Sequence, residues 1–402
     1  MRLRPTFAFV LLGVLASGQT LAGTMASFTP LGVVPLDFPY SYGTGLSADG
    51  QTAFAYSAYN RSGSGLNSNM PVRWTESQGL EELVDRSRGI SGVTTRSNSD
   101  GTALVGYNTN AGASGRTLPF LWTADSGYVE LGLPHPLATF SFAFDVTDDA
   151  STVVGSYNRN GTRIPLYWTE SGGYQLVELP AGYGSTHFYG VSDDGSVVIG
   201  HSVSMAQAFR WTDSNGFELL STLGDDGGFV ASQARNLSAD GSVIVGSGEL
   251  SEGDMAFRWT AETGMQPLGA VTDELVATGA FAVSGDGNVV GGSGRTASGV
   301  EGWIWDETHG VQSLRQLLVD QGVDMDDWII SEVNALSYDG SVVVGTAASA
   351  SRQRNEAFIA TLGTKVPEPP SAFLLLATVG GLAIVGRNRS RQFSSQSVST
   401  PR

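Results

Sequence analysis

One structural unit recurs seven times between residues 43 and 363, and this repetition limits the possible folds more than any other feature of the sequence. Six tryptophans are spaced 43 to 48 residues apart, and a glycine stands five positions after each of them. These tryptophans are Trp74, Trp122, Trp168, Trp211, Trp259 and Trp305. The seventh copy has Ala360 at the tryptophan position. Such repeats are typical of small units that bury their apolar faces only against neighbouring units.

Most copies also carry an Asp-Gly pair between two apolar runs. The glycines of these pairs are Gly50, Gly101, Gly195, Gly241, Gly287 and Gly340. The third copy has Asp149 and Ala150 instead. Asp-Gly is a strong hairpin signal because glycine adopts the positive φ that a tight turn needs. An aspartate is favoured before this glycine because its carboxylate accepts a hydrogen bond from a nearby backbone N–H. Weak Ca²⁺ binding by an acidic surface is the alternative role for these aspartates.

The sequence of each copy predicts four short antiparallel strands. The first strand precedes the Asp-Gly turn, and the second is the apolar run that follows it. In the third strand, which contains the tryptophan, side chains alternate between the two faces of the sheet. The fourth strand begins at the glycine five residues after the tryptophan. Four strands in about 46 residues match the period of propeller blades. We therefore predict an all-β, seven-bladed β-propeller over residues 27–364, since a closed ring covers both faces of every blade. A long two-sheet sandwich and an open β-solenoid are the alternatives.

The seventh copy ends at residue 363 without a fourth strand, whereas residues 28–32 have the pattern of a fourth strand without a copy of their own. We expect this amino-terminal strand to complete the last blade and close the ring. Between the sixth and seventh copies, the spacing of apolar residues predicts one short helix near 313–321. The acidic segment 324–328 then forms either a cation-binding loop or a solvated turn beside that helix.

The composition excludes several kinds of site. The 402 residues include no cysteine, which rules out disulfides, thiolate metal sites and a cysteine nucleophile. A net charge of −17 argues against nucleic acid as a partner. The four histidines, at positions that are not equivalent between copies, lack a zinc-binding spacing; they are His135, His187, His201 and His309. The sequence therefore predicts no catalytic, cofactor-binding or metal-binding residue.

The two ends of the chain differ from the repeats. Residues 1–26 combine early arginines, an apolar run and small residues, which is typical of a signal peptide cleaved after Ala22 or Ala26. Near the other end a Pro-Glu-Pro element precedes the apolar stretch 372–386 and an arginine cluster. The residues of these two elements are Pro367, Glu368, Pro369, Arg387, Arg389 and Arg391. A membrane span prefers about 20 apolar residues, so this shorter stretch favours transient anchoring.

This tail, residues 365–391, resembles the PEP-CTERM sorting signal of Gram-negative bacteria. The resemblance implies transient anchoring in the inner membrane, processing by an exosortase-type membrane protease, and delivery to the cell surface or extracellular matrix. The polar extension 392–402 departs from the family pattern. The repeats resemble the HAF-type extracellular repeat, without its histidine, through Ala-Phe pairs at 208–209, 256–257 and 357–358. That family implies a secreted or surface location and a repeat architecture, and it brings no settled activity.

Two classes of function remain. We favour a monomeric, non-catalytic surface or matrix module that binds an exopolysaccharide, a cation or another envelope component. The alternative is a secreted propeller enzyme, a lyase or hydrolase acting on glycans, whose carboxylates converge at a central channel. Only His187 and His201 of the fourth copy and the segment 324–328 deviate from the repeat pattern with polar residues that the other copies lack. Neither deviation combines an acid, a base and a nucleophile.

Overall fold

The structure is a computed structural model, which describes residues 24–34, 39–60, 67–85, 90–111, 116–220, 230–250, 253–272, 275–297 and 299–363. Residues 25–363 form one compact unit. The predicted cleavage position Ala22 and the apolar stretch 372–386 lie outside the described residues. The predicted sorting residues lie outside them too, namely Pro367, Glu368, Pro369, Arg387, Arg389 and Arg391. No helix in the described ranges has the length and apolar character needed to cross a bilayer.

The strands follow one another in groups of four that match the sequence copies. The first strands are β2 (Tyr40–Leu46), β6 (Gly92–Ser97), β10 (Ala138–Val146), β14 (Thr186–Val191), β18 (Ala231–Leu237), β23 (Leu275–Val283) and β27 (Trp328–Leu336). The second strands are β3 (Thr52–Asn60), β7 (Ala103–Ala111), β11 (Thr152–Arg159), β15 (Val198–Ser202), β19 (Val243–Leu250), β24 (Val289–Thr296) and β28 (Val342–Ser349).

The third strand of each group carries the tryptophan position, and the fourth begins at the glycine five residues later. The third strands are β4 (Asn67–Thr75), β8 (Arg116–Thr123), β12 (Thr162–Thr169), β16 (Gln207–Thr212), β20 (Gly253–Thr260), β25 (Gly299–Asp306) and β29 (Arg354–Thr361). The fourth strands are β5 (Gly79–Glu82), β9 (Gly127–Glu130), β13 (Gly173–Gln175), β17 (Gly216–Leu219), β21 (Gly264–Pro267) and β26 (Gly310–Ser313).

Hydrogen bonding joins these strands into six sheets, whereas the sequence predicts seven blades. Four of the sheets have four strands, and a fifth sheet carries an additional short strand, β22 (Ala270–Thr272), at its edge. The remaining sheet has eight strands because one parallel pair, Phe140 with Thr117, joins β10 to β8 of the preceding copy. The prediction of an all-β protein built from four-stranded antiparallel sheets is confirmed, and the number of blades stays a prediction.

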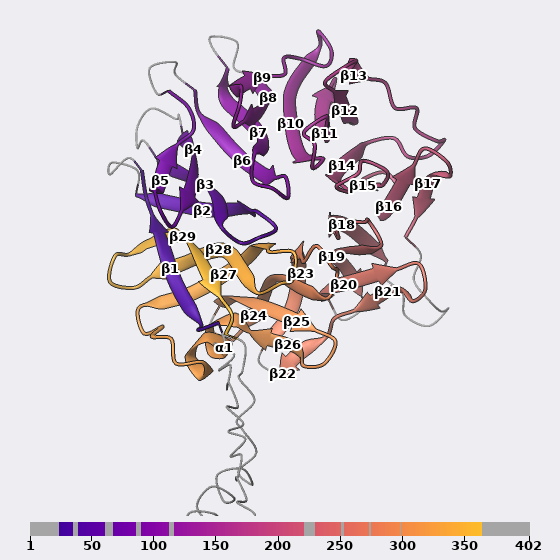
Figure 1. The fold of residues 1–402 in the computed structure, drawn as a ribbon. Coiled ribbons are helices and arrows are strands. Elements are labelled where there is room, and N and C mark those ends of the chain that lie inside the picture. Colours follow the sequence, from indigo (N-terminus) through magenta and orange to yellow (C-terminus); the bar gives the residue numbers. More distant parts are fainter. Residues whose placement is uncertain are drawn as a thin grey trace, which may run out of the picture. The chain divides into compact units, whose positions relative to one another are not determined.

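The strand groups follow one another around a common centre, and β2 of the first copy contacts β27, β28 and β29 of the last (Figure 1). The strand β1 (Ser27–Gly32) pairs antiparallel with β29, so it occupies the place of the missing fourth strand. Phe28 of β1 stacks on Phe358 with ring centroids 5.1 Å apart. Ala26, the second predicted cleavage position, directly precedes β1, so cleavage there leaves this strand whole.

The Asp-Gly turns are held by hydrogen bonds to the carboxylates of their own aspartates. In the fourth copy the Asp194 carboxylate accepts hydrogen bonds from the Ser196 N–H (2.9 Å) and the Ser192 hydroxyl (2.7 Å). These bonds hold the pKa of Asp194 below its ordinary value. Ala150 has a φ of 57°, close to the 75° of Gly195 at the equivalent position. The turn aspartates are thus explained by local backbone chemistry.

The tryptophan positions lie at the boundaries between successive copies. Trp122 and Trp259 are buried, and the other four are partly buried. In three copies an arginine directly before the tryptophan stacks on the tryptophan of the next copy. These pairs are Arg73 over Trp122 (5.7 Å), Arg210 over Trp259 (5.9 Å) and Arg258 over Trp305 (5.8 Å). Each such contact ties one copy to the next.

The predicted helix is present as α1 (Leu314–Asp320), with Ser313 as its N-cap. Leu314 and Leu318 are fully buried in the same apolar cluster as residues of β27 and β28. In the acidic segment that follows, the Asp327 carboxylate accepts hydrogen bonds from the Ser349 hydroxyl (2.7 Å) and the Ser351 N–H (2.7 Å). Of the two interpretations of the segment, these contacts favour the turn beside the helix.

Candidate binding site at the centre of the repeats

Every first strand contains a register irregularity at the same place, shortly before the turn. Such a β-bulge leaves one residue out of the ladder and changes the direction of its side chain. The bulged residues are Thr44, Thr95, Phe144, Tyr189, Arg235, Phe281 and Asn334. All seven are partly buried, and all seven line one cavity.

This cavity, called the wide cavity below, has a volume of about 360 Å³. Besides the bulged residues, its lining includes Tyr42, Tyr56, Glu332 and Thr346. The rings of Tyr42 and Tyr56 stack at 5.2 Å. Thr346 is 2% exposed, and its hydroxyl has no hydrogen-bond partner among the described residues. The cavity thus combines aromatic faces with unsatisfied polar groups, as ligand sites do.

A second hollow adjoins the wide cavity between the fifth and sixth copies. This side groove also has a volume of about 360 Å³, and it shares Arg235 and Phe281 with the wide cavity. Gln233, Glu249 and Asp254 are among its polar lining residues. Because Arg235 and Phe281 belong to both hollows, the two hollows lie next to each other.

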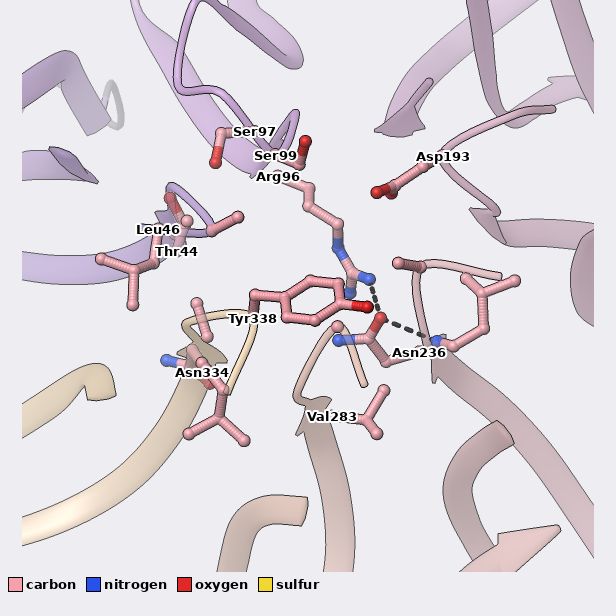
Figure 2. Close-up of a pocket in the computed structure, with 17 residues that line it drawn as sticks. Thr44, Leu46, Arg96, Ser97, Ser99, Asp193, Asn236, Val283, Asn334 and Tyr338 are labelled. Carbon is pink, nitrogen blue, oxygen red and sulfur yellow. Dashed lines mark hydrogen bonds between the residues drawn. The ribbon is translucent and has the colours of Figure 1, made fainter. Parts of the chain in front are cut away.

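A narrow cavity of about 110 Å³ lies beside the Asp-Gly turns (Figure 2). Arg96 extends from the second copy into this cavity and donates a hydrogen bond to the side-chain oxygen of Asn236 in the fifth copy. The Arg96 guanidinium also lies 3.6 Å from the carboxylate of Asp145 in the third copy. Since Arg96 lines both cavities, it separates them and links three copies.

Two carboxyl groups near Arg96 have raised pKa values. Burial raises the pKa of Asp145 to about 6, against the opposing effect of the Arg96 charge and of hydrogen bonds from the N–H groups of Val191 and Val146. Burial and the neighbouring carboxylates raise the pKa of Asp193 to about 6 as well. Asp193 in the lining of the narrow cavity, and Asp145 beside Arg96, therefore bind protons more tightly than exposed carboxylates do.

The structure brings the two histidines of the fourth copy together. His187 and His201 are cross-strand neighbours whose rings stack at 5.0 Å, and each ring lies 5.4 Å from Tyr189. Burial, helped by the charges of Arg163 and Arg235 for His187, lowers the pKa of both imidazoles to about 4. Both rings are consequently neutral at pH 7. The Nδ1 atom of His201 is buried and has no partner in the described ranges.

The other two histidines lie apart from the cavities. His135 is partly buried, and its Nδ1 accepts a hydrogen bond from the Leu137 N–H (3.0 Å). His309 is exposed and lies 2.8 Å from the Asp306 carboxylate. Within the part of the chain that the structure describes, no three or more His, Cys, Asp or Glu side chains are grouped as a metal site requires.

Comparison with known proteins identifies the fold alone. No protein-family model matches the sequence, and no curated protein matches it at a significant level. Among solved structures, a catalytically inactive histidine-to-alanine variant of virginiamycin B lyase from Staphylococcus aureus, crystallised with quinupristin, is similar with a TM-score of 0.51 and 12% identity. The similarity covers 84% of this chain and 99% of the lyase. The chain has a β-propeller-like fold.

An acylaminoacyl peptidase from Pyrococcus horikoshii is similar too, with a TM-score of 0.53, 11% identity and 81% of this chain covered. The chain spans only 52% of that peptidase. Sequence identities this low indicate a shared architecture and carry no information about the chemistry of the site. The chemistry of the wide cavity therefore has to be argued from its own residues.

Sequence reasoning did not find the cavity residues. The repeats are recognisable by the positions that stay the same between copies, whereas the bulged position carries a different side chain in most copies. The variability itself was the available signal. A position that varies inside an otherwise regular strand is free of the packing that fixes its neighbours.

Proposed function

We propose that this protein is an exported, non-catalytic, seven-bladed propeller that binds a glycan in the wide cavity. The observation that carries the proposal is that seven bulged residues, one from each copy, line a single cavity. A site of this kind exists only when all copies are assembled. It can differ in chemistry from protein to protein while the repeat framework stays unchanged.

The lining of the wide cavity suits a sugar. Sugar rings present apolar C–H faces and hydroxyl edges, so they pack on aromatic rings and bond to amide and charged groups. Phe144, Tyr189 and Phe281 supply aromatic surfaces on one part of the wall, and Glu332 and Asn334 supply polar groups on another. The adjoining side groove gives a polymer room to continue beyond the cavity.

The proposed location and processing of the protein rest on features of its sequence. Export by a signal peptide, passage through the inner membrane, cleavage by an exosortase-type protease and residence at the cell surface form the second part of the proposal. An extracellular polysaccharide would be available there as a ligand. The similarity of the tail to PEP-CTERM signals and of the copies to HAF-type repeats supports this location.

Binding can be tested by affinity electrophoresis of the purified chain in gels containing soluble polysaccharides. We expect at least one polysaccharide to retard the wild-type protein. Tyr189→Ala should abolish most of that retardation, since the ring lies in the cavity wall, while Tyr338→Ala, beside the narrow cavity, should leave it unchanged. Wild-type mobility that no glycan alters, or equal effects of the two variants, would refute the proposal.

The ring of seven blades can be tested separately through β1. Deleting residues 25–32 removes the partner of β29 and exposes Phe358, which should lower stability by about 3–5 kcal/mol. Deletion of residues 1–24 keeps β1 and serves as the control. Equal thermal midpoints for the two truncated proteins would show that β1 does not close a ring.

The enzyme alternative has one observation in its favour. Two neutral histidines stack beside Tyr189 at the cavity wall, and a neutral imidazole can act as a base. The electrophoresis experiment separates the two functions when bound glycan is recovered afterwards. Shortened chains would favour a lyase or hydrolase, and intact chains would favour the binding module.

A further inference from the structure

Arg235 stands where the wide cavity and the side groove meet, because it lines both. Its guanidinium lies 5.2 Å from the ring centroid of Tyr189, and one terminal nitrogen donates a hydrogen bond to the Gln233 side-chain oxygen (2.7 Å). The Nε atom is buried and has no hydrogen-bond partner within the described ranges. A guanidinium held by stacking and by one hydrogen bond is prepared to bind an acceptor through its terminal nitrogens.

Among the described residues, Arg235 also lacks a direct ion pair, although Glu249 and Asp254 line the same side groove. None of the ion pairs in the described part of the chain includes Arg235 or Arg163. Arg163 stacks on Phe142 at 5.3 Å, and the pKa of His187 is lowered partly by the positive charges of both arginines. In a chain of net charge −17, two arginines without an ion-pair partner so close to one histidine are unusual.

Another part of the lining carries the opposite charge. Glu332 lines the wide cavity on the seventh copy, and its charge contributes to the raised pKa of Tyr56. An anionic group entering the cavity is therefore attracted toward Arg235 and repelled from Glu332. This asymmetry fixes which side of a charged ligand faces which wall.

We propose that the ligand of this site is an acidic glycan, whose sugar carboxylate binds Arg235 at the junction while the sugar ring lies against Tyr189. The proposal rests on the proposed function and adds the charge of the ligand to it. A guanidinium binds a carboxylate through two parallel hydrogen bonds, which neutral hydroxyls do not provide. Arg163, whose charge also acts on His187, adds to the positive potential near Arg235.

The test compares two polymers with the same backbone, polygalacturonate and its fully methyl-esterified form, with neutral glucans and xylans in the same assay. The full chain should bind polygalacturonate at least about tenfold more tightly than the ester, and the difference should shrink at high salt because charge attraction is screened. Arg235→Gln should remove most of the difference, and Arg235→Lys should retain part of it. Arg163→Gln should have a smaller effect in the same direction.

Arg258→Gln is the matched control, because Arg258 also stacks on an aromatic ring and also has a buried Nε without a partner among the described residues, but it lines neither the wide cavity nor the side groove. It should leave both affinities unchanged. Equal binding of the two polymers, or equal losses in Arg235→Gln and Arg258→Gln, would overturn the inference. Binding of neutral glycans alone would overturn the inference and leave the proposed function standing, whereas binding of no glycan would remove both.

Discussion

The narrow and the wide cavity are built largely from the same first strands, yet they differ in whether an arginine of the lining is paired with other side chains of the protein. At the narrow cavity Arg96 is engaged by Asp145 and Asn236, so that its charge links three copies. At the wide cavity Arg235 has no carboxylate partner among the described residues and retains an unpaired nitrogen. Polar groups that satisfy one another stabilise a fold, and polar groups left unsatisfied are available to a ligand.

The largest difference between the cavities should appear in stability. Arg96→Met leaves the nearly buried Asp145 without its cation, which should cost about 3 kcal/mol of the free energy of unfolding. Arg235→Met removes no ion pair of the described chain and should cost less than about 1 kcal/mol, the value of its stacking on Tyr189. Urea denaturation of both variants measures the two values. Similar losses would mean that the cavities do not differ in this way.

The two regions should also respond to pH in opposite directions. Because the pKa of Asp145 is raised from 3.8 to about 6, the folded protein holds a proton that the unfolded chain lacks between about pH 4 and 6, and stability falls as pH rises through that window. The pKa of His187 and of His201 is lowered from 6.5 to about 4, so the unfolded chain binds the extra protons and stability rises with pH between about 4 and 6.5.

Variants separate these opposing contributions. Asp145→Asn removes one of the two falling contributions, and that of Asp193 remains, so stability should rise more steeply with pH than in the wild type, by about 3 kcal/mol at most between pH 4 and 7. The double variant His187→Gln and His201→Gln removes the rising contributions, so its stability should fall relative to the wild type as pH rises from 4 to 7. Denaturation midpoints across this range are the measurement. Parallel profiles for Asp145→Asn and the wild type would contradict the assignment.

The smallest effect concerns the turns that border the narrow cavity. Ala150 has a left-handed backbone, which strains a residue with a Cβ, so Ala150→Gly should stabilise the protein by about 0.5–1 kcal/mol. The reverse change at the equivalent turn, Gly195→Ala, should destabilise it by about 1 kcal/mol, since its new Cβ would also lie 3.3 Å from Thr147. Thermal unfolding of both variants measures these two changes in stability. Destabilisation by Ala150→Gly would show that lost packing or unfolded-state entropy outweighs strain.

Much of the architecture could be predicted because it depends on local chemistry that is repeated. The Asp-Gly turns, the glycines after the tryptophans and the helix Leu314–Asp320 each need only a few neighbouring residues to form. The vacancy in the seventh copy and the unmatched segment 28–32 were both visible in the sequence, and β1 pairs with β29 in that position. The joining of two copies by Phe140 and Thr117 was not visible, because one bridge between strands leaves no periodic signal.

The sequence alone therefore determined the repeating unit, its strands and turns, and the strand that completes the last copy, because those features are short in range or recur. Only the tertiary structure decided what the centre contains. Arg96 meets Asn236 across 140 residues, and Arg235 faces the wide cavity only because a bulge turns it there. Such contacts depend on the register of strands and on which copies lie opposite one another, and no single copy carries that information.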